Sequence, residues 1–350
     1  MNISTLYILY KEYINSAVRM FFSRYSTFKK FSNLLKALIS TYFTKTEKVD
    51  HYPVRLYIDP TNICNLRCPL CPTGRGEIGR ERGFMELSLF RKIVDELRDY
   101  LFQVDLYLWG EPLLNKQILS MINYCHRWKI RTRISTHFSL MKVDYEGLVR
   151  SGLDELIVSL DGASPETYDV YRIGGKFGLV IDNIRRLSDA KSRLGSKNPE
   201  IVWQYLVMAH NDKEIQKAKD MAKSLGVRLR IVPARAGIGE SILKDHEENS
   251  YKGWASRKIS RYKPNGERRF KITSCLFLWL QSVINWDGGV APCCPSFSSR
   301  NDFGNVSLNS FWDIWNGERY VYARHAVKNK LKNVDIICSN CIKRGYFVDP

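Results

Sequence analysis

Three cysteines stand close together in the segment YIDPTNICNLRCPLCPTG. Cys64, Cys68 and Cys71 have the spacing C-x3-C-x2-C, which places three thiolates on one short loop. Cysteine thiolates are the usual ligands of iron–sulfur clusters, and three of them can hold three irons of a 4Fe–4S cube. The fourth iron then keeps an open coordination position, as catalytic metal centres do. The spacing predicts a catalytic iron–sulfur site, with an incomplete zinc knuckle or a loop of buried thiols as the alternatives.

A second group of cysteines lies near the end of the chain. Cys275 is followed by Cys293 and Cys294 in the segment WDGGVAPCC, and then by Cys338 and Cys341 with the spacing C-x2-C. A C-x2-C pair with two distant thiolates also suits tetrahedral zinc. Cys294 competes with Cys293 for a place in the site, because adjacent residues rarely both point at one metal. The residues alone therefore predict a metal site without deciding between iron–sulfur and zinc.

Strands and helices alternate between residues 54 and 234, and these elements must position the first cysteine loop. The expected strands are 54–58, 105–109, 131–136, 155–160, 201–208 and 227–232, and the expected helices are 88–100, 116–128, 143–150, 178–193 and 212–225. Such alternation predicts βαβ units and a parallel sheet, either open or closed into an incomplete barrel. Ligands of these sheets bind at the carboxyl ends of the strands, which is where the cysteine loop lies. Cys125 falls within an expected helix and is predicted to be a small buried hydrophobic residue.

Composition limits the class of protein. The chain has 350 residues, 44% hydrophobic and 26% charged, which indicates a globular protein of about two domains. Lys and Arg number 54 against 36 Asp and Glu, and the net charge of +18 favours an anionic partner. No apolar run approaches the roughly 18 residues that span a bilayer, and the first residues lack a signal-peptide pattern. Nine cysteines without a secretion signal indicate a reducing, cytoplasmic compartment, in which clustered thiols bind metal.

The first 46 residues are distinct, with seven Lys or Arg against one acid, Glu12. Apolar residues recur at spacings of three and four, which predicts two amphipathic helices. The two sets are Ile14, Val18, Phe21 and Phe22, and then Phe31, Leu34, Leu35 and Leu38. Such helices either pack on the rest of the protein or lie on an anionic membrane surface, and both interpretations stay open here.

The first cysteine motif and its context resemble the radical S-adenosylmethionine (radical SAM) superfamily, over most of the chain. The resemblance implies an α/β fold, a partial (β/α)6 TIM-type barrel, with the cysteine loop after its first strand. It also implies a 4Fe–4S cluster whose fourth iron binds the amino and carboxylate groups of SAM. Further motifs follow in the expected order: LYLWGEPLLN, RISTH, IVSLDG, YRIGGKF, YLVMAHND and RIVPAR. Trp109 replaces the first glycine of the family's GGEP motif.

These motifs imply roles for single residues. The implied cofactor-binding residues are Gly110 and Glu111 on the ammonium group, Ser135 as a further contact, Ser159 and Asp161 on the ribose, and Arg172 on the carboxylate. Val207, Asn211 and Val232 are weaker candidates for the adenine side. His137 stands where asparagine is common in the family, and its role stays open.

The C-terminal block resembles the SPASM/twitch auxiliary domain. The spacing from Gly288 to Cys293 and the aromatic run Phe311, Trp312, Ile314 and Trp315 are typical of it. A full SPASM domain carries seven cysteines and two clusters, whereas this chain supplies enough for one. The resemblance implies one auxiliary 4Fe–4S cluster on Cys275, Cys293, Cys338 and Cys341. The implied domains are a basic helical segment at 1–50, the radical SAM core at 51–240, a basic linker at 241–271 and the auxiliary domain at 272–350.

The resemblance implies reductive cleavage of SAM to methionine and a 5′-deoxyadenosyl radical that abstracts hydrogen from a substrate C–H bond. A cysteine-saturated auxiliary cluster would then accept an electron, giving an oxidised or cross-linked product. The expected partners are a one-electron donor such as flavodoxin or ferredoxin and an unidentified substrate, which is a peptide, a sugar-type metabolite or a lipid. A peripheral contact of residues 1–46 with the cytosolic face of the membrane is the alternative to packing of this segment on the rest of the protein. No specific nucleic-acid partner is inferred; the alternative functions are a zinc-binding, non-enzymatic adaptor and an RNA-modifying radical SAM enzyme.

Overall fold

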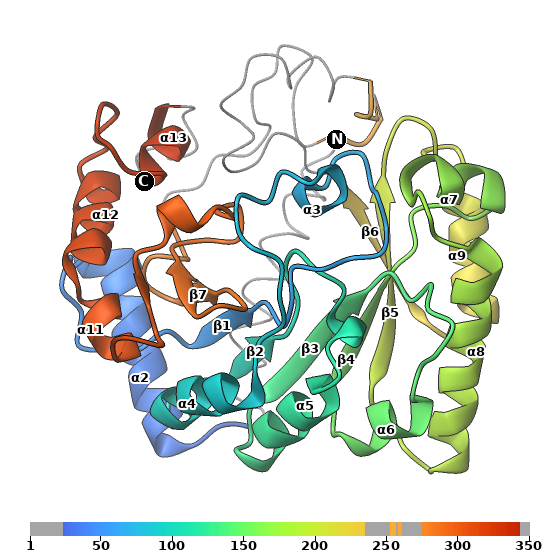
Figure 1. The fold of residues 1–350 in the computed structure, drawn as a ribbon, viewed down its shortest axis with the longest axis horizontal. Helices are drawn as coiled ribbons and strands as arrows, with labels where there is room; N and C mark the ends of the chain where they lie inside the picture. Colours follow the sequence, from blue (N-terminus) through green and yellow to red (C-terminus); the bar gives the residue numbers. More distant parts are fainter. Residues whose placement is uncertain (1–23, 235–252, 257, 261–274, 344–350) are drawn as a thin grey trace.

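The computed structural model describes residues 24–234, 253–256, 258–260 and 275–343. Its centre is a sheet with the strand order β6-β5-β4-β3-β2-β1-β7-β8-β9 (Figure 1). The first six strands are β1 Arg55–Ile58, β2 Gln103–Asp105, β3 Arg131–Thr136, β4 Glu155–Ser159, β5 Glu200–Val207 and β6 Arg228–Pro233, and all are parallel. The predicted α/β fold with a partial barrel is confirmed.

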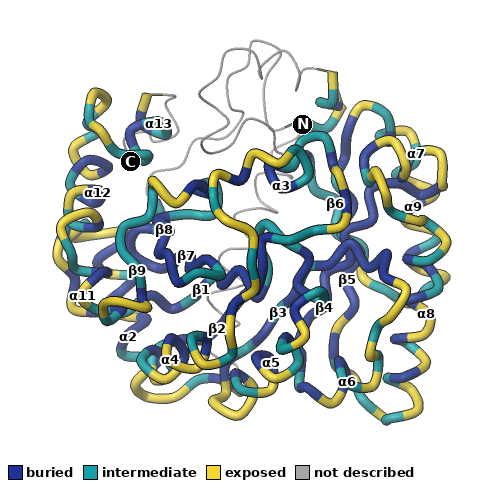
Figure 2. The backbone as a smooth tube through the Cα atoms, in the orientation of Figure 1, coloured by how far each residue is buried: buried dark blue, intermediate teal, exposed yellow. Residues whose placement is uncertain are grey.

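Helices follow the strands in the βαβ pattern. They are α3 Pro72–Arg75, α4 Leu87–Leu97, α5 Ile118–Arg127, α6 Tyr145–Arg150, α7 Pro165–Tyr171, α8 Phe177–Arg193 and α9 Ile215–Ser224. The apolar faces of α4 to α9 cover one side of the sheet, and Cys125 of α5 is fully buried in this main core, as predicted. In Figure 2 the strands are largely buried, while the outer helices alternate between buried and exposed positions.

The two faces of the sheet differ in chemistry. In β3, Thr132, Ile134 and Thr136 are buried, whereas Arg131, Arg133 and Ser135 alternate with them and are partly exposed. Ile134 packs in the main core with the helices. Because strand side chains alternate between faces, the arginines and Ser135 occupy the opposite, concave face of the sheet. The concave face is therefore polar.

One predicted strand is displaced. The apolar run 105–109 predicts a strand, but the paired residues of β2 are Gln103–Asp105. Asp105 is fully buried, and its carboxylate accepts hydrogen bonds from the guanidinium groups of Arg55 and Arg133. A buried carboxylate is tolerated where opposite charges satisfy it. A strand between two others, such as β2, can therefore contain a buried aspartate. The helix α7 and the C-terminal strands were also not predicted from the sequence.

Only part of the predicted helical N-terminal segment lies within the described residues. The set from Ile14 to Phe22 and most of the expected linker 241–271 lie outside the described residues. The second set forms α2 Phe28–Ile39, followed by the π-helical turn η1 Ser40–Thr44. Leu34 and Ala37 pack against Val54, Phe102 and Leu280, so this helix packs on the body of the protein. No helix within the described ranges is long and apolar enough to cross a membrane.

The C-terminal domain extends the sheet. Its strand β7 Gln281–Ile284 pairs in parallel with β1, and β8 Gly289–Ala291 and β9 Gly304–Asn305 continue in antiparallel order. The helices α11 Phe311–Trp315, α12 Glu318–Lys328 and α13 Cys338–Lys343 complete this domain. The amide N–H of Asp59, directly after β1, donates to the carbonyl oxygen of Ile284 at 2.9 Å.

The loop between α3 and α4 is held by the C-terminal domain. The Arg80 side chain is only 3% exposed, and its guanidinium contacts Asp287 and Asp302, with a shortest distance of 2.6 Å to the latter. The indole N–H of Trp286 donates to the Glu81 carbonyl oxygen at 3.0 Å. A Cβ atom on Gly83 would lie 2.3 Å from the Trp286 ring, so only glycine fits there. Arg80 thus links the two domains by buried charge.

We expect Arg80→Gln to lower the free energy of unfolding by about 3 kcal/mol, because it leaves Asp287 and Asp302 together without their cation. Anaerobic chemical denaturation measures this loss. The control is Arg98→Gln, because Arg98 pairs with Asp95 at the exposed surface. That variant should lose less than about 1 kcal/mol. Equal effects of the two substitutions would contradict the linking role of Arg80.

Candidate functional site

The first cysteine loop covers the carboxyl ends of the strands. It runs from the end of β1 to α3, whose N-cap residue is Cys71. Cys68 and Leu66 pack with Met208, just after β5, and with Tyr171, at the end of α7. A Cβ on Gly74 would lie 2.6 Å from the Cys68 carbonyl oxygen, so α3 requires glycine where it passes the backbone of the loop. All three cysteines of this loop are free thiols.

The chemistry of these thiols suits a cationic metal group. Burial raises the pKa of Cys64 to about 12 and also raises the pKa of Cys68, so thiolates here need nearby positive charge. A metal cluster supplies that charge, because its ligands bind as thiolates. Within the described ranges, no three His, Cys, Asp or Glu side chains form a group for a single metal ion. A 4Fe–4S cube instead takes its thiolates on separate irons.

A buried ion pair stands beside the loop. The Nε of Arg172, directly after α7, donates to Asp161 at 2.7 Å, and its Nη1 lies 3.8 Å from the Cys68 sulfur. Asp161 is fully buried and also accepts from the Leu206 amide at 2.8 Å. Burial lowers the pKa of Arg172, but attraction to Asp161 outweighs it, and the guanidinium stays charged. Asp161, predicted to contact the ribose, lies where it holds Arg172 beside Cys68.

A second buried carboxylate connects the loop to two strand ends. One oxygen of Glu111 accepts from the Leu113 amide at 3.1 Å, and the other accepts from the His137 amide at 2.9 Å. The amide of Glu111 itself donates to the Ile63 carbonyl oxygen at 2.9 Å. A Cβ on Gly110 would lie 1.9 Å from the Thr61 carbonyl oxygen. The loop and the Gly110–Glu111 segment therefore pack in direct backbone contact.

His137, whose role the sequence left open, bridges this network. Its Nδ1 accepts from the Ser139 amide at 3.0 Å, so the proton resides on Nε2. Nε2 lies 2.9 Å from Oδ1 of Asn65, a residue of the cysteine loop. Burial lowers the pKa of His137, so the ring is neutral near pH 7. His137 thus donates a hydrogen bond that holds the cysteine loop from the third strand.

Several residues of the site were missed or are placed differently. Asn65 was not singled out, although its position between two ligand cysteines is a signal. Asp59 at the end of β1 is buried, accepts from the Trp109 amide at 3.2 Å, and has a pKa raised to about 7 by burial. The signal for Asp59 in the sequence was its position directly after the expected strand 54–58. Val207 is buried in the main core, and the Asn211 amide group donates to the Asp161 carbonyl oxygen at 2.9 Å, which supports the turn after β5.

Ser135 and Ser159 are brought together on the concave face. Their hydroxyl oxygens lie 3.2 Å apart on the neighbouring strands β3 and β4. Val232 lies on β6, two strands from Ser159. The structure thus collects the predicted polar residues along the strands beneath the cysteine loop.

The second cysteine group also converges. Burial raises the pKa of Cys293 well above its usual value, and the charges of Cys338, Cys341 and Cys275 add to this. Cys338 and Cys341 both lie on α13. Cys294 acts electrostatically on both Cys293 and Tyr57 of β1. Cys293 therefore lies near the other cysteines of this group.

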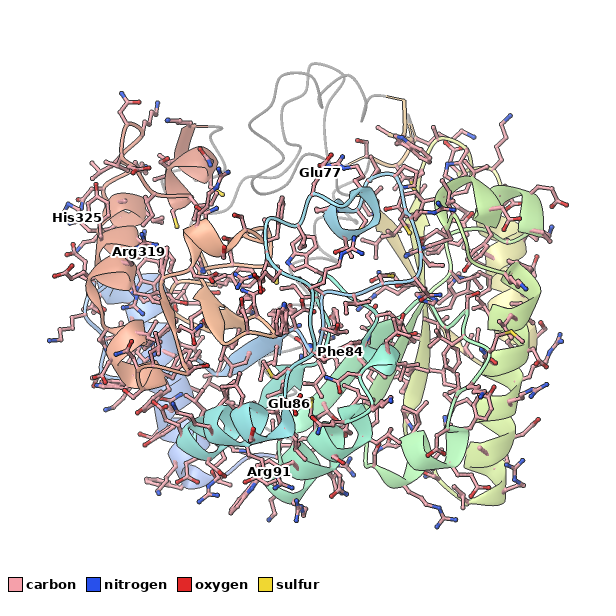
Figure 3. The ribbon with its side chains drawn as sticks, viewed as in Figure 1. Glu77, Phe84, Glu86, Arg91, Arg319 and His325 are labelled. Atoms are coloured by element: carbon pink, nitrogen blue, oxygen red, sulfur yellow. The ribbon has the colours of Figure 1, made fainter. Side chains whose placement is uncertain are left out.

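We expect His137→Ala to lower the free energy of unfolding by about 2 kcal/mol, because it removes the hydrogen bonds to Asn65 and the Ser139 amide. His325→Ala is the control, since that ring lies at the outer surface of α12 (Figure 3). It should cost less than about 1 kcal/mol. Anaerobic denaturation measures both, and equal losses would contradict a bridging role.

His137 also predicts a pH dependence. Its folded pKa is lowered, so the unfolded chain binds more protons below about pH 6.5 and stability falls as the pH decreases. His137→Gln cannot titrate, so its stability should decline less steeply than that of the wild type from pH 7 to pH 5.5. Parallel curves for the two proteins would overturn this assignment.

Comparisons with known proteins agree with this geometry. The family model of the Radical SAM superfamily matches residues 58–222, and that of the SPASM iron–sulfur cluster-binding domain matches residues 275–342. A tungsten-containing aldehyde ferredoxin oxidoreductase cofactor-modifying protein from Pyrococcus furiosus is 25% identical over 316 residues, which cover 83% of this chain and 87% of the relative. A mycofactocin maturase from Mycobacterium ulcerans is 26% identical over 196 residues, 55% of this chain and 51% of the relative.

A solved structure shows the same fold. Streptococcus suis SuiB bound to its precursor peptide SuiA has a TM-score of 0.61 and 16% identity, covering 91% of this chain and 80% of SuiB. The two family matches contain both groups of cysteines described above. The radical SAM match implies a 4Fe–4S cluster and SAM, and the SPASM match implies auxiliary iron–sulfur binding. The chain therefore belongs to the radical SAM superfamily and is an enzyme of the type that carries a SPASM domain.

Proposed function

We propose that this enzyme abstracts a hydrogen atom from an unactivated C–H bond of its substrate and passes the remaining electron to an auxiliary 4Fe–4S cluster. The product is then oxidised or cross-linked, and a flavodoxin or ferredoxin supplies the initiating electron. When bound, the first cluster and SAM supply a 5′-deoxyadenosyl radical. The single observation that carries the proposal is the free thiol loop over the strand ends, with Arg172 3.8 Å from Cys68.

The chain's own residues then position the cofactor. Cys64, Cys68 and Cys71 would hold the cluster, and Arg172, kept cationic by Asp161, would bind the carboxylate of SAM. Glu111 could accept from the ammonium group through Oε1, which keeps a second lone pair beyond its hydrogen bond from the Leu113 amide. Ser135 and Ser159 offer hydroxyl groups from the strands beneath. The buried charges near the loop support these roles.

The C-terminal cysteines support the electron-accepting role. Cys275, Cys293, Cys338 and Cys341 would complete the coordination of an auxiliary cluster, so no iron would be open to substrate. Tyr57 of β1 lies between the two domains, with its ring centroid 5.8 Å from that of Phe277. Because the chain is a radical SAM enzyme, it is not a non-enzymatic adaptor. Its substrate is a peptide, a sugar-type metabolite or a lipid; the peptide gains support from SuiB, which was solved with a precursor peptide.

We expect the anaerobically reconstituted enzyme to cleave SAM to 5′-deoxyadenosine with a strong reductant, and to bind about eight irons. Replacement of Cys64, Cys68 and Cys71 by alanine should abolish cleavage and leave about four irons. Cys125→Ala is the control, because that thiol is buried in the main core. It should keep cleavage and all the iron. Undiminished cleavage by the triple variant would refute the function, and complete loss of iron would refute an independent auxiliary cluster.

We also propose that α2 and the following turn η1 contact a membrane surface. Phe28 is 86% and Phe43 80% exposed, and Ile39 is half exposed, whereas Leu34 and Ala37 face inward. Lys29 and Lys36 pair with Asp99 and Asp50, so apolar contact rather than charge carries this surface. Figure 1 shows α2 on the outside of the molecule, away from α7 to α9.

We expect the triple variant Phe28→Ser, Ile39→Ser and Phe43→Ser to lose binding to phosphatidylglycerol–phosphatidylcholine vesicles in a sedimentation assay. Each serine removes apolar area worth about 25 cal/mol per Å² buried. The control is the pair Met141→Ser and Leu308→Ser, since both residues are exposed elsewhere on the protein. This control should bind as the wild type does. Unchanged binding of the triple variant would remove the membrane contact.

A further inference from the structure

A row of polar residues crosses the concave face of the sheet beneath the cysteine loop. The strand register aligns Ser159 of β4 with Gln204 of β5, and Gln204 with Arg230 of β6. Their neighbours Trp203 and Ile231 lie on the opposite face, against the helices. Leu206, two residues further along β5, packs against the cluster of residues that contains the cysteine loop. The row therefore lies one step deeper in the barrel than the loop.

Most arginines on this face have carboxylate partners. Arg55 and Arg133 both contact Asp105. Arg131 pairs with Glu155 at 2.8 Å, and Arg228 pairs with Glu200 at 2.6 Å. In each of these pairs both charged side chains belong to strands of the sheet. The arginine charges near the amino ends of the strands are therefore largely neutralised by carboxylates.

Arg230 is different. Its Nη2 donates to the amide oxygen of Gln204 at 2.6 Å, and its Nε is buried without a hydrogen-bond partner. Among the ion pairs of the described residues, none involves a carboxylate with Arg230. A buried N–H without a partner costs about 1–3 kcal/mol, and a planar guanidinium binds carboxylate or phosphate through two parallel hydrogen bonds. An oxyanion would satisfy both the charge and the vacant Nε.

The surroundings of Arg230 are polar. The charge of Arg230 acts on the hydroxyl of Tyr107, which also accepts from Nη2 of Arg133 at 3.1 Å. The Ser159 and Ser135 hydroxyls continue the row. Hydroxyls and an amide can donate to an oxyanion without repelling it.

We propose that Arg230 binds an anionic group of the substrate, a carboxylate or a phosphate, on the concave face below the cysteine loop. The inference rests on the proposed function, because that face is where the substrate C–H bond would be presented to SAM. The carboxylate of SAM is the other source of such a group. Arg172 already stands 3.8 Å from Cys68, beside the expected cofactor, and this leaves Arg230 for the substrate.

Inorganic phosphate is the probe that tests the site. Its Kd for the SAM-loaded holoenzyme is measured by equilibrium dialysis at constant ionic strength, with chloride as the competing salt. We expect Arg230→Gln to weaken phosphate binding at least tenfold and Arg230→Lys, which keeps the charge, to weaken it less. Arg228→Gln is the matched control, two residues along the same strand and already paired with Glu200. It should change the Kd less than twofold.

The Kd of SAM separates the two sources of carboxylate. It should differ less than twofold between the wild type and Arg230→Gln, and a tenfold rise would assign Arg230 to the cofactor and overturn the proposal. Absent phosphate binding by the wild type, or equal binding by Arg230→Gln, would also overturn it. If the wild type binds phosphate in this pattern but fails to cleave SAM, the anion site stands and the proposed radical function fails.

Discussion

The buried carboxylate of Glu111 joins the cysteine loop to the strands beneath it, and the rest of the site depends on this contact. Its two oxygens are used by backbone amides from its own turn and from the end of β3, at 3.1 and 2.9 Å. His137, placed by that second bond, then reaches Asn65 between two of the cysteines. A carboxylate buried in this way is stable only while its donors stay in place. The loop therefore has one position relative to the sheet, although it has no regular secondary structure between β1 and α3.

The cysteine loop and most of the parallel strands were predictable because each depends on local pattern. The spacing of Cys64, Cys68 and Cys71 can be recognised in the sequence without knowing any tertiary contact. The alternation of side chains in β3 likewise identifies its buried face. The position of β2 was not predictable, because β2 begins at the polar residue Gln103, which is buried and donates from its side-chain amide to the Asp105 carboxylate that Arg55 and Arg133 also contact. Hydrophobic periodicity does not report pairs of charges that meet across strands.

Partners distant in sequence explain the other differences. The sequence assigned Asp161 and Arg172 to the cofactor separately, whereas the fold joins them at 2.7 Å, so that one residue orients the other. Arg80 had no signal, because its carboxylates lie more than two hundred residues further along the chain. For His137 the motif marked the position, but only the amide of Ser139 at Nδ1 shows which nitrogen carries the proton.

The pairing of β7 with β1 makes the two domains parts of a single sheet. Any swing of the C-terminal domain away from the barrel would break backbone hydrogen bonds, such as the one from Asp59 to Ile284, in addition to the Arg80 ion pairs. The distance between the two cysteine groups is consequently fixed by the fold. A substrate must fit this distance, because the two domains do not move relative to each other to shorten it.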